Sequence, residues 1–329
     1  MKVLYAIQGT GNGHLSRARD IIPLLQKKKI DLDILVSGTQ SDVELPYPVA
    51  YRLNGLSFTI GKTGGIDLWQ TYRNTNTRKL RKEISELPVE RYNLVINDFE
   101  PVSAWACWLK RKPCVGLGHQ VAVLSPNAPK PGTSDPVGRA ILQKYAPTTR
   151  QYGFHFKSYQ RDIFTPVIRQ EIRQARNEAK DHYTVYLPAY KDEILISQLS
   201  KIKSARWEIF SKHSKSSYEQ GAIRVRPVSN KGFISSMTSA KGILCGSGFE
   251  TPAETLYLGK KLMVIPMKWQ YEQHCNAASL QEMGIPVIKS LKDKYLDVIR
   301  EWVDSENRIE VDYPDETEDI IDRLLDENL

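Results

Sequence analysis

A glycine-rich stretch near the N-terminus ends in a histidine that could act as a general base. The segment "QGTGNGHLSRARDII" places Gly9, Gly11 and Gly13 at alternate positions, and His14 follows them directly. Glycines let the backbone approach a ligand closely, and an imidazole can take up a proton near neutral pH. A tight turn followed by a helix-capping histidine explains the same residues, so the stretch alone leaves both interpretations open.

The spacing of these glycines disfavours a dinucleotide cofactor. A dinucleotide-binding loop has the pattern G-x-G-x-x-G, with an acidic residue at the end of the second strand. Here the pattern is G-x-G-x-G-H, and the second expected strand ends at Ser37-Gly38. We therefore expect no NAD and no other cofactor.

A second glycine-rich turn lies in the segment "ILCGSGFETPAETLYLGKKLMVIPMKWQYEQHCNAASL". Gly246-Ser247-Gly248 leads into a helix expected to begin near Thr251, and a helix N-terminus suits a pyrophosphate. Glu254, about one turn further on, could accept hydrogen bonds from ribose hydroxyls. Glu272 and Gln273 follow the next strand, and a carboxylate beside an amide suits a sugar with many hydroxyls. An exposed polar loop explains any one of these residues but not the ordered set.

These stretches need strands and helices to position them, and the sequence alternates between the two along its whole length. Expected strands cover 2–7, 32–38, 92–98, 113–118 and 152–156, and then 183–188, 206–211, 222–227, 241–246 and 262–267. Helical spacing occurs at 15–28 and 192–202. The fold class is α/β, with two Rossmann-like, doubly wound domains of parallel strands facing a cleft.

The expected domain limits follow from these runs. An N-terminal domain covers 1–165 and a C-terminal domain covers 166–312, with the charged segment 168–182 as the best candidate for the junction. The last segment, 313–329, carries Ile320, Ile321, Leu324 and Leu325 on one face of a helix. We expect this helix to return to the N-terminal domain.

Composition limits the partners. The 329 residues carry a net charge of +8, but residues 301–329 hold 2 basic against 12 acidic side chains. A basic body attracts phosphorylated small molecules or an anionic membrane, although surface lysines also serve solubility alone. No nucleic-acid motif occurs, so no nucleic-acid partner is expected. Without a secretory signal or a long apolar run, the expected location is cytoplasmic, with the inner face of the membrane as an alternative.

The segment 246–276 resembles the donor-site signature of two-domain GT-B glycosyltransferases. This class contains the UDP-glucuronosyltransferases, the plant UDP-glycosyltransferases and the bacterial lipid-linked GlcNAc transferase of peptidoglycan synthesis. The opening "GTGNGHLSRA" is similar to the first glycine-rich loop of these enzymes, and "LVINDFEPVSAWA" and "VGLGHQ" lie in the matching order between the two. The resemblance implies a nucleoside-diphosphate sugar held by the C-terminal domain and an acceptor facing the N-terminal domain.

The resemblance also implies the residues of the donor site. The turn from Gly246 to Thr251 would bind the phosphates through the backbone amides of Ser247, Gly248 and Phe249. Glu254 would bind the ribose, Glu272 and Gln273 the donor sugar, and Phe233 and Ile234 the base. Leu244 and Ser247 replace a histidine and a tryptophan of the plant motif, so one phosphate-binding group of those enzymes is missing.

On the acceptor side the resemblance implies His14 as the catalytic base and Asp98 as the carboxylate that orients it. Gly11 and Gly13 would leave room for the substrates, and His119 and Gln120 would face the acceptor. A base of this kind is worth roughly 10²–10⁴-fold in rate. Glu100 and His119 are the alternative bases.

The expected reaction moves a sugar from a nucleoside-diphosphate donor, UDP by preference, to an acceptor hydroxyl with inversion. The helix N-terminus would stabilise the leaving UDP, and we expect no metal site of the Asp-x-Asp type. The acceptor is open among lipid-linked, glycan and small-molecule substrates. Two alternatives share the fold: a sugar-nucleotide 2-epimerase and a non-catalytic nucleotide-sugar-binding protein.

Overall fold

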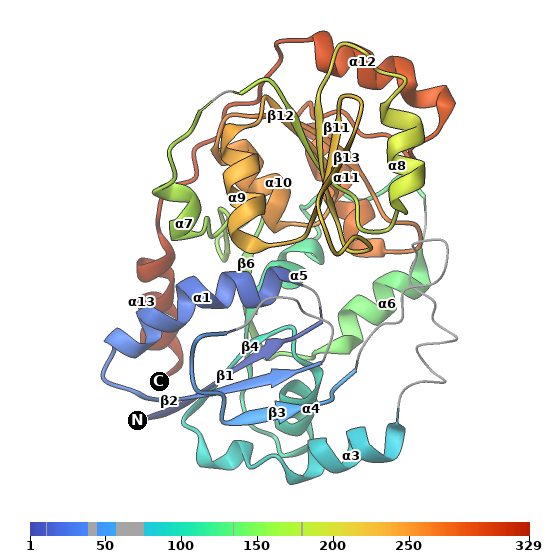
Figure 1. Cartoon of the computed structure of the whole chain (residues 1–329). Coiled ribbons are helices and arrows are strands. Elements are labelled where there is room, and N and C mark those ends of the chain that lie inside the picture. Colours follow the sequence, from blue (N-terminus) through green and yellow to red (C-terminus); the bar gives the residue numbers. More distant parts are fainter. Residues whose placement is uncertain (11, 39–44, 57–75, 134, 179) are drawn as a thin grey trace.

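The computed structural model describes the whole chain except residues 11, 39–44, 57–75, 134 and 179. Two β-sheets, each flanked by helices, form two lobes that Figure 1 shows one above the other. The predicted α/β class with two Rossmann-like sheets is therefore confirmed. Of the predicted site residues, Gly11 lies outside the described residues.

The N-terminal sheet is parallel throughout, in the order β3-β2-β1-β4-β5-β6-β7. Its strands are β1 (Lys2–Gln8), β2 (Asp31–Ser37), β3 (Tyr51–Leu53), β4 (Leu94–Asp98), β5 (Val115–Gly118), β6 (Arg150–Phe154) and β7 (Ile163–Phe164). The strand order reverses between β1 and β4, and ligands of doubly wound folds bind at the carboxyl ends of strands at such a point. The ends of these two strands carry the glycine-rich stretch and Asp98.

The C-terminal sheet has the order β10-β11-β9-β8-β12-β13. Its strands are β8 (Tyr183–Tyr186), β9 (Trp207–Ser211), β10 (Tyr218–Gln220), β11 (Ile223–Pro227), β12 (Gly242–Gly246) and β13 (Lys261–Ile265). The expectation of parallel pairing is wrong at one edge, because β10 and β11 form an antiparallel hairpin. Gly221, with a φ of 60°, lies between them and supplies the left-handed conformation of the turn.

The described helices of the N-terminal lobe are α1 (Asn12–Lys27), α3 (Thr77–Glu86), α4 (Pro101–Leu109), α5 (His119–Val123) and α6 (Pro136–Tyr145). Those that follow are α7 (Gln170–Arg173), α8 (Asp192–Leu199), α9 (Asn230–Ser239), α10 (Glu250–Tyr257), α11 (Tyr271–Glu282), α12 (Leu296–Asp304) and α13 (Thr317–Asn328). Helix α1 begins three residues earlier than its apolar spacing predicts, so His14 lies in its first turn.

Helix α13 lies beside α1, at the opposite end of the chain, as Figure 1 shows at its lower left. Its four predicted apolar residues are buried, and Leu324 has no exposed surface. The acidic face forms ion pairs with basic residues of the N-terminal lobe, Lys28 with Asp322 at 2.6 Å and Arg150 with Glu327. The charge excess of the tail is thus partly neutralised by basic residues of the body.

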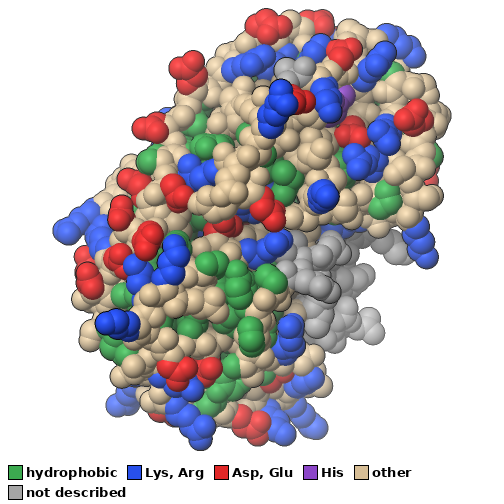
Figure 2. Space-filling model, turned by 60° about the vertical axis from the view of Figure 1, so that its left-hand side comes forward, with side chains coloured by type: hydrophobic (Ala, Val, Ile, Leu, Met, Phe, Trp, Pro, Cys, Tyr) green, Lys and Arg blue, Asp and Glu red, His purple; other side chains and the backbone are tan. Residues whose placement is uncertain are grey.

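The charges of the rest of the surface are mixed. On the face in Figure 2, basic and acidic side chains are interspersed over both lobes. All four cysteines are free and buried. Among the described helices, none is long and apolar enough to cross a bilayer.

Candidate active site

A cavity of about 1460 Å³ lies between the two lobes. Small-molecule sites usually measure about 300–1,000 Å³, so this cavity has room for two substrates at once. Its N-terminal wall includes Gly13, His14 and Gln120, and its C-terminal wall includes Gly248 and Glu272. The cavity therefore brings together the two stretches that the sequence singled out.

His14 and Asp98 form a hydrogen-bonded pair in the N-terminal wall. The β1–α1 turn places His14 at the end of β1, and Asp98 is the last residue of the neighbouring strand β4. His14 Nδ1 lies 2.8 Å from Asp98 Oδ1, and His14 Nε2 lies 3.4 Å from the amide nitrogen of Gln120. A carboxylate accepts from Nδ1–H and an amide N–H donates to Nε2, so these partners favour the tautomer whose Nε2 can accept a proton.

Asp98 is fully buried and remains ionised through a second partner. Arg17, one turn after His14, donates from Nη2 to both oxygens of Asp98, at 2.7 and 2.8 Å. Burial alone would raise the pKa of the Asp98 carboxyl, but the charge of Arg17 and the contacts with His14 outweigh it, and the pKa lies below its ordinary value. Asp98 does not line the cavity; it lies behind His14.

Phe99 follows Asp98 with a φ of 56°, a left-handed conformation that is unfavourable for a bulky side chain. Its ring stacks against Tyr145 at 4.6 Å between centroids and lies nearly parallel to His14 at 6.3 Å. Both His14 and Phe99 line the cavity. The unfavourable backbone conformation of Phe99 thus places its ring beside the His14–Asp98 pair.

The donor-side turn connects β12 to α10. Gly248, Phe249 and Thr251 line the cavity, and no described atom lies within 4 Å of the position that a Cβ on Gly248 would take. Gly246 and Ser247 lie behind this wall, and the Ser247 hydroxyl donates to the Gln273 carbonyl at 2.8 Å. The space beside Gly248, at a helix N-terminus, can accommodate an anion.

Glu254 lines the cavity but is bound by an arginine that the sequence did not reveal. Arg169 Nε and Nη2 donate to the two Glu254 oxygens at 2.5 and 2.7 Å. Both residues are buried, and both line the cavity. A carboxylate has about four acceptor positions, so Glu254 retains capacity for ligand hydroxyls.

Glu272 and Gln273 open α11 on the same wall. Glu272 Oε2 accepts from the Gln120 amide at 3.2 Å, a contact between the lobes. Gln273 Oε1 accepts from the Met267 backbone N–H at 2.9 Å, which holds the loop before α11 in place. Glu272 thus faces the pair around His14, whereas the amide of Gln273 is partly used within its own lobe.

The alternative bases are held in other contacts. His119 is 1% exposed, with Nδ1 at 2.8 Å from the Phe154 carbonyl and Nε2 at 2.7 Å from Asn276 Oδ1. Burial lowers the pKa of His119. Glu100 caps α4 by accepting from the backbone N–H groups of Val102 and Ser103. Burial raises the pKa of Glu100, and its side chain does not reach the cavity.

The structure brings most of the predicted residues to one cavity and leaves a few behind it. The predicted residues on the wall are Gly13, His14, His119, Gln120, Phe233, Gly248, Phe249, Thr251, Glu254, Glu272 and Gln273. Asp98, Ile234, Gly246 and Ser247 lie off the wall. Arg17, Arg169, Glu250 and Phe99 were missed, because no local pattern marks a residue whose partner is far away in the sequence.

Metal-binding candidates are few in the described part of the chain. No group of three or more clustered His, Cys, Asp or Glu side chains there could hold a metal ion. The segment Asp31-Leu32-Asp33 has the Asp-x-Asp spacing, but it opens β2 at the edge opposite the cavity. Asp33 accepts from the Tyr92 hydroxyl at 2.7 Å and pairs with Lys2 at 3.0 Å.

Two facing Rossmann-like lobes with a substrate-sized cavity between them are the architecture of the GT-B fold. Residues 1–305 match the family model described as glycosyl transferase family 1, and the chain belongs to that family. The UDP-N-acetylglucosamine–N-acetylmuramyl-(pentapeptide) pyrophosphoryl-undecaprenol N-acetylglucosamine transferase of Finegoldia magna is 23% identical, over 98% of this chain and 97% of its own. The predicted glycosyltransferase class is confirmed.

Solved structures show the same fold. The glycotransferase of kitacinnamycin superposes with a TM-score of 0.59 at 12% identity, over 99% of this chain and 94% of the other. UGT89C1 of Arabidopsis thaliana, complexed with UDP, has a TM-score of 0.58 at 12% identity, with the same coverage of 99% and 94%. At these identities the likeness shows the fold alone.

Proposed function

We propose that the enzyme transfers a sugar from a nucleoside-diphosphate donor, UDP by preference, to an acceptor hydroxyl, with inversion and without a metal ion. The observation that carries the proposal is the His14–Asp98 pair, 2.8 Å apart, which faces the open turn before α10 across one cavity. A base and an anion site on opposite walls are what direct displacement of a diphosphate requires.

The chemistry follows from the tautomer of His14. Nε2 of His14 takes the proton of the substrate hydroxyl while the oxygen of that hydroxyl attacks the anomeric carbon. The bond between the anomeric carbon and the diphosphate breaks in the same step. Asp98 stabilises the imidazolium, as the aspartate does in a catalytic triad. The positive end of α10 stabilises the leaving diphosphate. Attack from the face opposite the leaving group inverts the anomeric carbon.

The donor identity is supported by two relatives. The name of the Finegoldia magna enzyme includes UDP-N-acetylglucosamine, and the Arabidopsis thaliana structure contains UDP. In this chain, Glu254 would bind the ribose, Glu272 the donor sugar, and the backbone near Phe233 the base. Arg169 would hold the Glu254 carboxylate in a fixed orientation, since it donates to both carboxylate oxygens.

Part of the acceptor side of the cavity is apolar. Phe99, Ile141 and Leu142 line the N-terminal wall, and Val137 of that wall and Trp269 of the opposite lobe are 56% and 75% exposed. Apolar side chains left in water on the rim of a site are typical of a binding surface. This lining supports an acceptor that carries an apolar portion next to its reactive hydroxyl.

A panel of nucleotide-sugars tests the proposal. We expect UDP-sugars to raise the unfolding temperature and, with an apolar acceptor alcohol, to release UDP at a rate unchanged by EDTA. NMR of the product should show the anomer opposite to that of the donor. Epimerised donor without UDP release would instead establish the 2-epimerase, and binding without any chemistry would establish a binding protein.

A further inference from the structure

Arg17 joins the catalytic pair of one lobe to the donor turn of the other. It lies three residues after His14, and therefore on the same face of α1. Its guanidinium donates to both oxygens of Asp98 and, from Nη1, to Oε1 of Glu250. The side chain is 2% exposed, and a planar guanidinium suits such a double contact better than an ammonium.

Glu250 occupies an unusual position for an acidic residue. It is the first residue of α10, beside the space where the proposed diphosphate would bind. Its carboxylate also contacts the backbone at Gly13, where any Cβ would overlap it. An unpaired carboxylate here would repel a diphosphate, and the charge of Arg17, which is shared with Asp98, offsets part of that repulsion.

We propose that Arg17 is a positioning residue that orients the His14–Asp98 pair and, through Glu250, holds it in register with the phosphate-binding end of α10. The inference rests on the proposed role of His14 as base. Arg17 and Glu250 together set the distance between the base His14 and the donor.

The charges around the His14 ring predict how substitutions of Arg17 and Glu250 affect it. The charged groups that face the ring are Asp98 from β4, Arg17 from α1 and Glu250 from α10, with Glu272 from α11 reached through Gln120. Arg17 Nη2 lies 3.3 Å from His14 Nδ1, and Arg17 Nη1 donates to Glu250. Removing either charge therefore changes the electrostatic environment of the ring.

Three variants separate charge from geometry. Arg17→Gln removes the cation, so the titration of the His14 ring should move to higher pH than in the parent chain. Glu250→Gln removes the opposing anion, so the ring should titrate at lower pH, and UDP should bind about 2- to 5-fold more tightly while kcat falls. Arg17→Lys keeps the charge but loses the double contact, so kcat should fall about 10-fold while the titration stays near that of the parent chain.

The experiment follows the histidine ring by NMR, assigned with His14→Ala, and measures kcat, KM and UDP affinity in parallel. Lys28→Gln is the matched control, because it breaks an ion pair between the end of α1 and α13 away from the cavity. Opposite shifts in the Gln variants, with a kcat loss in Arg17→Lys, support the inference. Unchanged titration and unchanged kcat in Arg17→Lys and Glu250→Gln overturn it, even if Arg17→Gln does not fold.

The NMR readout also separates this inference from the proposed function. If His14→Ala is fully active while the ring titrates as expected, the assignment of the base is wrong and the coupling of charges stands. If His14→Ala is inactive but the Arg17 and Glu250 variants behave like the control, the base stands and the positioning role is wrong.

Discussion

The rings of His119 and Phe249 stack with their centroids 3.8 Å apart and an angle of 4° between their planes. His119 begins α5 in the N-terminal lobe, and Phe249 precedes α10 in the C-terminal lobe. The stack, together with the contact from His119 to Asn276, joins the acceptor wall to the donor turn. The two halves of the site are thus positioned by direct packing between the lobes.

Replacing His119 tests whether that contact is structural. His119→Phe keeps a ring against Phe249 but leaves the Phe154 carbonyl and Asn276 without their partner. Buried groups left unpaired cost about 1–3 kcal/mol, so the free energy of unfolding in urea should fall by that amount. The acid limb of the kcat/KM profile should not move. A 10²-fold loss of kcat with unchanged stability would instead place His119 in the chemistry.

Replacing His14 tests the catalytic base. His14→Ala should lower kcat by about 10²-fold or more, because the base acts in the transition state and not on the bound donor. Asp98→Asn should lower kcat in the same sense, and the double variant should cost far less than the sum. UDP affinity, measured by calorimetry, should stay within about 2-fold of the parent chain. Near-normal turnover of His14→Ala would refute the assignment.

Replacing Glu254 tests the ribose site. Glu254→Gln keeps the shape of the side chain but weakens its acceptor, and a charged hydrogen bond is worth about 1–3 kcal/mol, so UDP should bind about 5- to 150-fold more weakly. The matched control is Glu282→Gln, at the end of α11, which breaks an exposed ion pair with Lys157. Equal UDP affinity in the two variants would show that Glu254 does not contact the ribose and serves Arg169 alone.

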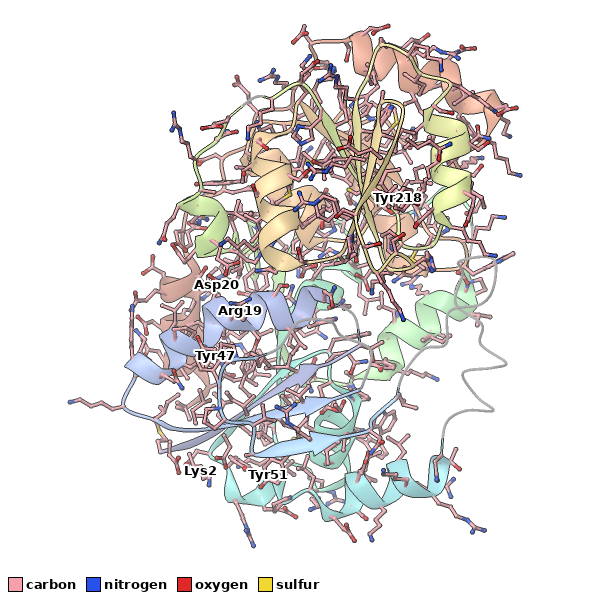
Figure 3. All side chains as sticks on the ribbon, in the orientation of Figure 1. Lys2, Arg19, Asp20, Tyr47, Tyr51 and Tyr218 are labelled. Carbon is pink, nitrogen blue, oxygen red and sulfur yellow. The ribbon has the colours of Figure 1, made fainter. Side chains whose placement is uncertain are left out.

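The carboxyl of Asp20 predicts a pH-dependent stability. Asp20 follows Arg19 on α1, as Figure 3 shows, and accepts from the backbone N–H of Gln170, the first residue of α7, at 2.9 Å. Burial raises the pKa of Asp20 to about 6, although Gln170 and the charge of Arg169 oppose the shift. Because the folded pKa exceeds the unfolded one, the contribution of Asp20 is fully present below about pH 4 and is lost as pH rises through 6.

Asp20→Asn should therefore be as stable as the parent chain at pH 4 and more stable at pH 8. The difference should be on the order of 2 kcal/mol after solvent screening is considered. Thermal unfolding at both pH values measures it, and Asp297→Asn, whose side chain is 86% exposed, serves as the control. A difference between Asp20→Asn and the parent chain that does not vary with pH would contradict the prediction.

The C-terminal helix should contribute to the stability of the N-terminal lobe. Leu324 is fully buried in α13 against the core that includes α1, so Leu324→Ala should cost about 2–5 kcal/mol. Leu329→Ala, at 45% exposure, should cost little. Chemical denaturation measures both. Equal stability of the two variants would mean that α13 is not an integral part of the core.

The amino-acid sequence determined the features that depend on local pattern. Apolar runs predicted most of the strands, apolar spacing predicted the helices at 15–28 and 192–202, and glycine-rich turns marked both walls of the cavity. The apolar face of the last helix was visible for the same reason. The antiparallel β10–β11 hairpin was missed because its exposed edge strand, Tyr218–Gln220, buries no side chain and so carries no periodic signal.

The tertiary structure decided which charged groups meet. Arg17 and Asp98 are 81 residues apart, Arg169 and Glu254 are 85 apart, and Arg17 and Glu250 are 233 apart. These contacts depend on the order of strands in each sheet and on how the lobes face each other. The spacing of residue types along the sequence indicates neither. The sequence could therefore name His14, Asp98 and Glu254, but the arginines that orient the carboxylates of Asp98 and Glu254 were shown only by the tertiary structure.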